Sequence, residues 1–391
     1  MDPAVTYPPA IEAEERGRLP TGELRRDARV GFAICDPGLS FGAIVGLGAK
    51  ERAVELGAQL SIVSAFTPEQ QAAVIDGLIA EAVDVLIVEA VESEIVVPAI
   101  SRAGAAGIPV IVADMRIHGF EPACTVRSDN VKGGELAARY LVDRLQRRGV
   151  IAHLQGLLTS DNGLDRSRGF HDVVDQETGI RVVETSSEWT THAGAAAMRE
   201  LLTTDPDLQA VFANNDALAL GAVAAIGEAG RTGEIVVVGF DALPNALLAV
   251  EEGTMAATVR QMPRAMGRTA VELALRVHSG QLVPSVVETD VALVTAESVA
   301  EASLATLPLF PHVLLELTES GDALSEERML LRTLIDNLPD LIYVKDEAGR
   351  FLVVNTATLR HFGAVRQEDV VGKTDFDFFP LELASRYRAD E

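Results

Sequence analysis

The segments VFANNDALALG (211–221) and IVVVGFDALP (235–244) decide the fold of this chain. Each begins as an unbroken apolar run that stops abruptly at polar residues. This pattern is typical of a central strand in a parallel sheet. Ligands of open α/β sheets bind just beyond the carboxyl ends of such strands. We therefore expect Asn215 and Asp241 to stand at a ligand site, whereas we favour a helix-capping role for Asp216.

The alternation of strand-like and helix-like segments continues from residue 28 to about residue 299. Such βαβα alternation predicts an α/β fold with parallel sheets and helices on both faces. One sheet of that many strands would be unusual, so we predict two doubly wound lobes joined by a three-strand hinge. The predicted crossings between the lobes lie near 115–122, near Met262 and near Glu288.

These patterns divide the chain into four regions. A flexible tail, rich in Pro, Glu and Arg, precedes a ligand-binding domain, a helical linker and a small mixed α+β segment. The predicted bounds are 1–27 for the tail, 28–300 for the domain (lobe 1 about 28–114 and 262–288, lobe 2 about 115–261 and 289–299), 301–337 for the linker and 338–391 for the last segment.

The pattern changes after about residue 299. Segments 308–319 and 325–337 read as helices, and leucines spaced by seven are suggestive of a short coiled coil, although packing against a neighbouring domain explains them equally well. Segments 341–345 and 351–354 read as a hairpin. Two strands do not make a stable domain, so the chain is either a fragment or needs a partner here.

Composition narrows the class of protein. The chain has 391 residues and a net charge of −25, which disfavours binding to a nucleic-acid backbone and to an anionic membrane. Residues 1–27 lack the apolar core of a signal peptide, and no apolar run approaches the length of a membrane span. We therefore expect a cytoplasmic protein. Cys35 and Cys124 lie in apolar contexts and read as buried free thiols.

No catalytic or metal-binding motif emerges. The seven histidines are scattered, and none pairs at metal-ligand spacing. Gly46-Leu-Gly48 and Gly372-Lys373-Thr374 resemble fragments of nucleotide-binding loops but lack required glycines. We predict no catalytic residue, no metal and no cofactor.

From residue 28 to about residue 299 the chain resembles the type I periplasmic binding protein family, closest to ribose-type sugar-binding proteins and the ligand domains of LacI-type repressors. The match extends in order through the whole unit. Its segments are DVLIVEAVES (84–93), GIPVIVAD (107–114), SDNVKGG (128–134), 207–221, 235–244, GTMAATVRQMP (253–263) and 267–271.

The resemblance implies a ligand held between two lobes that close about a hinge. An aromatic face covers the apolar side of a sugar, and carboxylates and amides bond its hydroxyls. By position, the implied ligand-binding residues are Phe41 and Trp189 as aromatic faces, Glu92 and Asp114 as carboxylates, Arg166, and Asn215, Asp241 and Gln261 near the hinge. Phe41 and Trp189 also fit plain core positions, and Gln261 a simple strand end.

Some positions depart from the family pattern. Leu164 stands where sugar-binding relatives usually carry Arg, Gly42 where a second aromatic residue is common, and Glu92 where Asp is more usual. A carbohydrate is the favoured ligand, and another small polar molecule is the alternative.

Residues 331–391 resemble the first half of a PAS domain, through LRTLIDNLPDLIYVKDEAGRFLVVN (331–355) and VGKTDFDFFP (371–380). The resemblance implies the input region of a bacterial histidine kinase or diguanylate cyclase of the two-component kind. We expect a homodimeric, cytoplasmic sensor that relays lobe closure through the linker. The alternatives are a solute-binding protein of a sugar importer, a repressor, for which residues 1–27 are too short and acidic, and an enzyme.

Overall fold

The computed structural model describes residues 24–25, 27–35, 41–65, 67–90, 93–157, 159–306, 343–345, 350–354, 358–359, 362 and 370–379. The chain divides into two units, 1–307 and 308–391, and each is described by itself. None of the helices in the described ranges is both long enough and apolar enough to span a membrane.

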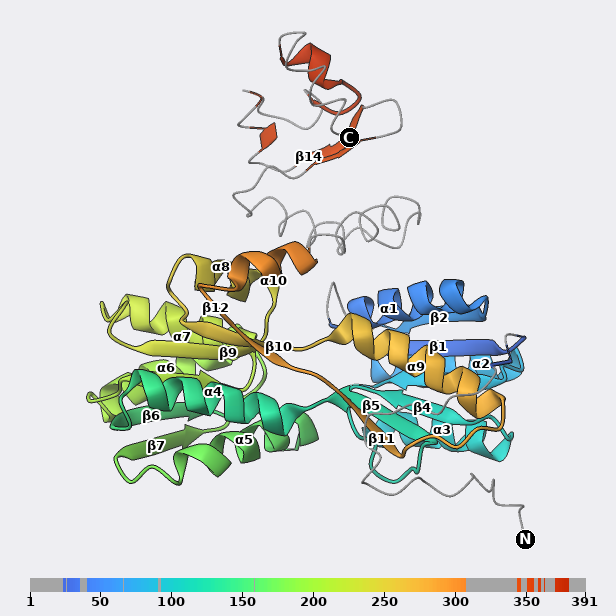
Figure 1. Cartoon of the computed structure of the whole chain (residues 1–391), viewed down its shortest axis with the longest axis horizontal. Coiled ribbons are helices and arrows are strands. Elements are labelled where there is room, and N and C mark those ends of the chain that lie inside the picture. The colour runs from blue at the N-terminus through green and yellow to red at the C-terminus, as the bar shows by residue number, and fades with distance from the viewer. Residues whose placement is uncertain are drawn as a thin grey trace. The chain divides into compact units, whose positions relative to one another are not determined.

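Lobe 1 of the first unit is a parallel six-stranded sheet in the order β11-β5-β4-β3-β1-β2 (Figure 1). Helices α1 and α9 cover one face, and α2 and α3 cover the other. The strands are β1 (Arg29–Cys35), β2 (Gln59–Ala65), β3 (Val85–Glu89), β4 (Val110–Ala113), β5 (Cys124–Ser128) and β11 (Val286–Thr289), and the helices are α1 (Phe41–Leu56), α2 (Pro68–Ala80), α3 (Ser93–Ala105) and α9 (Pro263–His278).

Lobe 2 repeats this order as β12-β10-β9-β8-β6-β7, except that its last strand, β12, runs antiparallel to β10. Helices α4 and α5 cover one face, and α6, α7, α8 and α10 the other. The strands are β6 (Gly149–Leu154), β7 (Ile180–Thr185), β8 (Ala210–Ala213), β9 (Val236–Asp241), β10 (Ala257–Arg260) and β12 (Ala292–Thr295), and the helices are α4 (Asn130–Arg144), α5 (Asp161–Val174), α6 (Thr191–Thr204), α7 (Asp216–Glu228), α8 (Pro244–Glu251) and α10 (Val299–Thr306).

Burial on both faces explains the unbroken apolar strands. In β3 every residue is buried, with Ile87 in the core beneath α1 and α9 and with Leu86 and Val88 in the core beneath α2 and α3. Successive side chains of a strand point to opposite faces, so a strand covered on both sides must be apolar at every position. The predicted fold class, two doubly wound α/β lobes, is confirmed.

Pairs of helices cross at reciprocal glycines. A Cβ on Gly48 of α1 would lie 2.0 Å from the backbone oxygen of Arg264, and one on Gly267 of α9 would lie 1.8 Å from that of Val45. Only glycine permits such a close approach between two backbones. The same arrangement recurs at Gly134 and Gly169 between α4 and α5, and at Gly194 and Gly221 between α6 and α7.

The first predicted hinge crossing is wrong. Strand β5 was assigned to lobe 2, but it pairs with β4 and β11 in the sheet of lobe 1, and the crossing follows Ser128 instead of lying near 115–122. The β4–β5 connection is short and returns to the same sheet, which periodicity alone does not reveal. The second crossing separates β10 from α9 at Gln261–Met262, as predicted, and the third separates β11 from β12 just after the predicted Glu288.

The ligand-binding domain also extends further than predicted. Helix α10 begins at Val299 and continues past the predicted end at residue 300, and its Val299 and Ala302 are buried in the core of lobe 2. The predicted linker helices at 308–319 and 325–337, and the predicted coiled coil, lie outside the described residues. In the second unit, β13 (Tyr343–Lys345) and β14 (Phe351–Val354) form the predicted antiparallel hairpin, with Phe351 fully buried in a small aromatic cluster.

Candidate functional site

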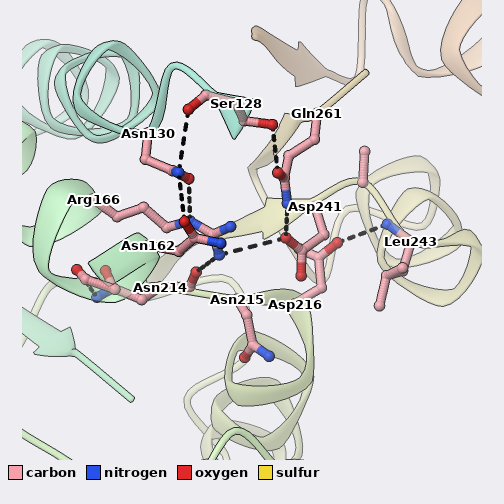
Figure 2. A network of polar contacts seen from close by, with 12 residues as sticks. Ser128, Asn130, Asn162, Arg166, Asn214, Asn215, Asp216, Asp241, Leu243 and Gln261 are labelled. Atoms are coloured by element: carbon pink, nitrogen blue, oxygen red, sulfur yellow. Dashed lines mark hydrogen bonds and ion pairs between the residues drawn. The ribbon is translucent and has the colours of Figure 1, made fainter. Parts of the chain in front are cut away.

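The two sheets bring polar residues together where their strands end near the hinge. Asp114 follows β4 of lobe 1, Asn214 and Asp241 stand at the ends of β8 and β9 of lobe 2, and Gln261 follows β10 at the second crossing. Carboxyl ends of parallel strands meet at one edge of a sheet, which is where open α/β folds place their ligands. Figure 2 shows Asn214, Asp241 and Gln261 gathered near Arg166 of α5. Asp114 joins this group through a hydrogen bond from Asn162.

Arg166 is the centre of this cluster, although only 5% of its surface is exposed. Its Nε donates to Asn130 Oδ1 at 2.9 Å and its Nη1 to the backbone oxygen of Asn214 at 2.6 Å. Nη1 also lies 3.5 Å from Asp241 Oδ1, and the guanidinium carbon lies 3.8 Å from the ring centroid of Phe240. A buried guanidinium requires such partners on all sides, because an unpaired charge away from water is costly.

Three carboxyl groups surround this one guanidinium. Burial raises the pKa of Asp114 to about 6, against the opposing effect of Arg166. Burial also raises the pKa of Asp241, and it holds the pKa of Asp216 well above its usual range, where the charge of Asp241 adds to the effect. A site with more carboxyls than cations accepts hydrogen bonds from a ligand and disfavours an anion.

The capping and buried roles within residues 214–216 differ from our prediction. Asn215 is the N-cap of α7, because its Oδ1 accepts from the backbone N–H of Leu218 at 2.9 Å. Asp216, for which we favoured that role, is fully buried; its carboxylate accepts from Thr258 Oγ1 at 2.7 Å and from the backbone N–H of Leu243 at 2.8 Å. It therefore ties α7 to β10 and to the start of α8, and the capping prediction for it is wrong.

Asn214, which the sequence did not single out, links more of the site than its neighbours do. It is fully buried, and its Nδ2 donates to Ser167 Oγ and to the backbone oxygens of Gln155 and Gly163 at 2.8–3.1 Å. Through its own backbone oxygen it positions Arg166. Asn215 keeps its Nδ2 without a partner among the described residues, so a ligand-binding role for Asn215 stays a prediction.

Gln261 lies at the hinge and is 4% exposed. Its Oε1 accepts from Ser128 Oγ at 2.7 Å, and its Nε2 donates to Asp241 Oδ1 at 2.6 Å (Figure 2). The amide therefore connects the first crossing, the second crossing and the end of β9. Gln261 can therefore act by orienting Asp241, and this role fits its position at least as well as direct contact with a ligand.

Polar contacts also join the two lobes beside the hinge. Asn162 of α5 donates from Nδ2 to both oxygens of Asp114 at 3.3 and 3.4 Å. Arg127 at the end of β5 donates to Asp165 of α5 at 2.6 Å and to Glu288 at 2.7 Å. The lobe-1 carboxylate predicted as a ligand group is thus within hydrogen-bonding reach of lobe 2.

The two predicted aromatic faces lie outside the hydrogen-bonded network around Arg166. Phe41 is half-buried at the start of α1 and packs on the core of lobe 1. Trp189 is half-buried and packs on the core of lobe 2, with its ring so close to Gly156 that a Cβ there would lie 2.6 Å away. Glu92 and the loop 36–40 lie outside the described residues. Leu164, the departure from the family pattern, is 45% exposed.

Some network residues were missed for an identifiable reason. Asn162 and Arg166 stand four residues apart and therefore share one face of α5. The apolar periodicity is clear only from Arg166 onward, whereas the helix begins at Asp161. A helix start at Ser160 would have placed Asn162 beside Arg166. Asn130 lies within the quoted segment 128–134, but its contact with Arg166 is long-range.

Comparisons with known proteins agree with this geometry. The model of a periplasmic binding protein domain matches residues 30–282, and the model of a PAS fold matches residues 335–390. The ribose import binding protein RbsB of Bacillus subtilis is 32% identical over 272 residues, which cover 69% of this chain and 88% of that protein. The same protein of Escherichia coli is 33% identical over 251 residues, covering 64% and 84%.

Solved structures resemble the same region. A periplasmic ribose ABC transporter protein of Conexibacter woesei matches with a TM-score of 0.68 and 28% identity, over 72% of this chain and 96% of that one. A periplasmic solute-binding protein of Actinobacillus succinogenes with bound D-allose matches with a TM-score of 0.64 and 30% identity, over 70% and 100%. Together with the family model, these relatives show that the chain belongs to the periplasmic binding protein family.

Proposed function

We propose that residues 28–306 bind a carbohydrate between the two lobes. The observation that carries this proposal is the convergence of Asp114, Arg166 and Asp241 at the hinge, where carboxyl groups exceed cations. Adjacent hydroxyls of a sugar suit carboxylate and guanidinium groups, which accept and donate paired hydrogen bonds. The names of relatives with ribose and D-allose support a neutral, polyhydroxylated ligand.

Binding would favour the closed arrangement of the lobes. A ligand shifts such an equilibrium only as far as it prefers one arrangement, so contacts from both lobes are needed. Asp114 supplies them from lobe 1, and Arg166, Asp241 and Asn215 from lobe 2. No catalytic step is part of this proposal.

The proposal is tested by a thermal-shift screen with D-ribose, D-allose and myo-inositol, the last being bound to a related solute-binding protein of Bacillus halodurans. We expect at least one sugar to raise the melting temperature of the wild type and to lose this effect in Asp241→Asn. Asp172→Asn, an exposed carboxylate on α5, is the matched control. A sugar-induced shift that survives Asp241→Asn would place the ligand elsewhere.

Two roles for a bound sugar follow from different observations. The relatives are import binding proteins, which supports delivery of the sugar to an importer. The PAS fold matched at 335–390 favours the second candidate, a cytoplasmic, homodimeric sensor in which the linker passes closure to the PAS segment. Cell fractionation of the native protein separates them, since export supports delivery and retention in the cytoplasm supports sensing.

A further inference from the structure

Two histidines and a glutamate that are far apart in sequence meet in lobe 2. They are His153 on β6, His171 on α5 and Glu184 on β7, and one nitrogen or oxygen of each lies within 4.8 Å of the others. The sequence showed no histidines at metal-ligand spacing. The fold nevertheless brings these three together, because β6 and β7 are paired strands and α5 packs on them.

Hydrogen bonding sets the orientation of His153. The two N–H groups of Asn214 Nδ2 face the backbone oxygens of Gln155 and Gly163, with Ser167 Oγ also 3.0 Å away, so the amide oxygen Oδ1 faces His153 Nε2 at 3.0 Å. Ser167 Oγ lies at the longer distance of 3.4 Å from the same Nε2. The imidazole Nε2 therefore carries the proton and donates, and Nδ1 presents a lone pair. Among the described residues this Nδ1 has no hydrogen-bond partner, and it lies 3.5 Å from Glu184 Oε1.

An imidazole lone pair facing a carboxylate is unfavourable unless a positive charge lies between them. His153 is fully buried, and its ring lies 4.6 Å from that of Phe170 and 5.3 Å from that of Phe212, measured between centroids. Aromatic surroundings that exclude water are a poor site for an imidazolium. A metal ion bound between Nδ1 and Glu184 would satisfy both groups.

The second histidine is oriented for the same purpose. Asp175 Oδ1 lies 3.1 Å from His171 Nδ1, and His171 Nε2 lies 2.7 Å from Glu184 Oε1. When a carboxylate accepts a hydrogen bond from Nδ1–H, Nε2 is left free to bind a metal. Such a carboxylate is the usual outer partner of a metal-binding histidine. Gln155 Nε2 donates to Glu184 at 2.7 Å and orients the third group.

We propose that His153 Nδ1, His171 Nε2 and a carboxylate oxygen of Glu184 bind a Zn²⁺-like divalent ion, with water at the fourth position. In a tetrahedral zinc site the ligand atoms stand about 3.4 Å apart, which matches the His153–Glu184 separation. The shorter His171–Glu184 separation opens by rotation of Glu184, whose side chain is 46% exposed. Two imidazoles and one carboxylate favour Zn²⁺ over Mg²⁺ or Ca²⁺.

The test is titration calorimetry with ZnCl₂ on the untagged chain after chelation and dialysis. We expect one Zn²⁺ per chain, and no comparable heat with MgCl₂. His171→Ala and Glu184→Gln should each weaken binding at least about tenfold, and Asp175→Asn about 10–100-fold through the orientation of His171. All three positions are partly or fully exposed, so these variants should keep the fold, which a melting curve checks.

The matched control is His192→Ala, an exposed histidine on α6 of the same lobe, which should bind Zn²⁺ as the wild type does. The proposal is overturned by wild-type protein that shows no 1:1 binding, or by equal affinity in the wild type and Glu184→Gln.

Discussion

Lobe 1 and lobe 2 share one strand order, but they differ in what they bury. In lobe 1 the fully buried Gln71 donates from Nε2 to the backbone oxygens of Ala33 in β1 and of Glu89 at the end of β3. Lobe 2 buries a charged centre, Arg166, together with Asn214 and Asp216. Lobe 1 also buries the guanidinium groups of Arg127 and Arg276, each paired with carboxylates. The lobes therefore differ in where the buried charge lies, because among the described residues only lobe 2 places a guanidinium beside the ends of its central strands β8 and β9.

The difference concerns how each lobe prepares a ligand site. The partners of Arg166, which are Asn130, Asn214 and Asp241, all belong to lobe 2, so contacts within lobe 2 alone fix its position. Lobe 1 adds Asp114 through Asn162 across the hinge. Preorganised groups bind with less loss of conformational freedom, and we infer that lobe 2 provides most of the affinity while lobe 1 contributes on closure.

The largest effect is expected at the centre of lobe 2. Arg166→Met removes the guanidinium and leaves Asp216 and Asp241 without their cation, so unfolding free energy should fall by about 3–5 kcal/mol, as when one partner of a buried ion pair is deleted. Chemical denaturation measures this fall. Arg168→Met on the same helix removes a 59% exposed side chain, and it should change stability by less than about 1 kcal/mol.

The helix crossings allow the two lobes to be disturbed equally. A Cβ on Gly134 would lie 2.0 Å from the backbone oxygen of Arg166, and a Cβ on Gly48 would lie 2.0 Å from that of Arg264. Gly134→Ala and Gly48→Ala should each cost about 1–3 kcal/mol through overpacking. Only Gly134→Ala should also weaken sugar binding in calorimetry, because it displaces Arg166.

Gly77→Ala is the control for both crossings. Gly77 lies inside α2, and a Cβ there would meet no atom within 4 Å. Alanine is the better helix former, so this variant should gain about 0.5–1 kcal/mol. Equal loss of sugar binding in Gly48→Ala and Gly134→Ala would remove the distinction between the lobes.

Asp114 should make the stability of the folded protein depend on pH. Its pKa is about 6 in the folded protein against 3.8 in the unfolded chain, so the folded state holds the proton longer. Stability should therefore decline as the pH rises from about 4 to about 6 and stay lower above that range, by on the order of 2 kcal/mol after allowing for partial exposure. Denaturation curves of Asp114→Asn should show a smaller decline, which the raised pKa values of Asp216 and Asp241 still cause, and higher stability than the wild type at pH 7.

Asparagine suits this position, because the backbone φ of Asp114 is 71° and Asn tolerates left-handed conformations. If the wild type and Asp114→Asn fall in parallel between pH 4 and 6, the buried carboxyl is not the cause.

The smallest effect is expected at the cap of α7. Asn215→Ala removes the acceptor for the Leu218 N–H and should cost about 1 kcal/mol in thermal unfolding. Asn215→Asp keeps the cap but replaces the amide donor. A loss of sugar affinity in Asn215→Asp without loss of stability would assign the amide to the ligand, and unchanged affinity would leave Asn215 as a cap alone.

The sequence predicted the fold well because each strand is covered on both faces. The apolar runs that begin the segments 211–221 and 235–244 correspond to the buried strands β8 and β9. The lobe predicted for β5 was wrong, because tertiary contacts decide which strands pair with it. The same limit applies to α10, whose sequence does not show that it packs on lobe 2.

The site was predicted in part. The strand-end pattern predicted Asp241, and the family resemblance named Asp114 and Gln261. All three lie in the polar cluster around Arg166, and their contact with a ligand stays a prediction. Residues 214–216 are all polar and all suit a helix cap. Only the geometry of the turn between β8 and α7 decides that Asn215 caps the helix and that Asp216 is buried. The contacts of Arg166 with Asn130 and Asn214, and the meeting of His153 with Glu184, join distant segments and leave no local pattern to detect.

The most direct test of the unequal roles of the lobes is the affinity for whichever sugar of the panel binds the wild type, measured by calorimetry at pH 7. We predict that Asp241→Asn weakens the affinity for the sugar at least about 100-fold, because it removes a charged acceptor in the preorganised lobe, and that Asp114→Asn weakens it less. Unchanged affinity in Asp241→Asn, or a larger loss in Asp114→Asn, would contradict it.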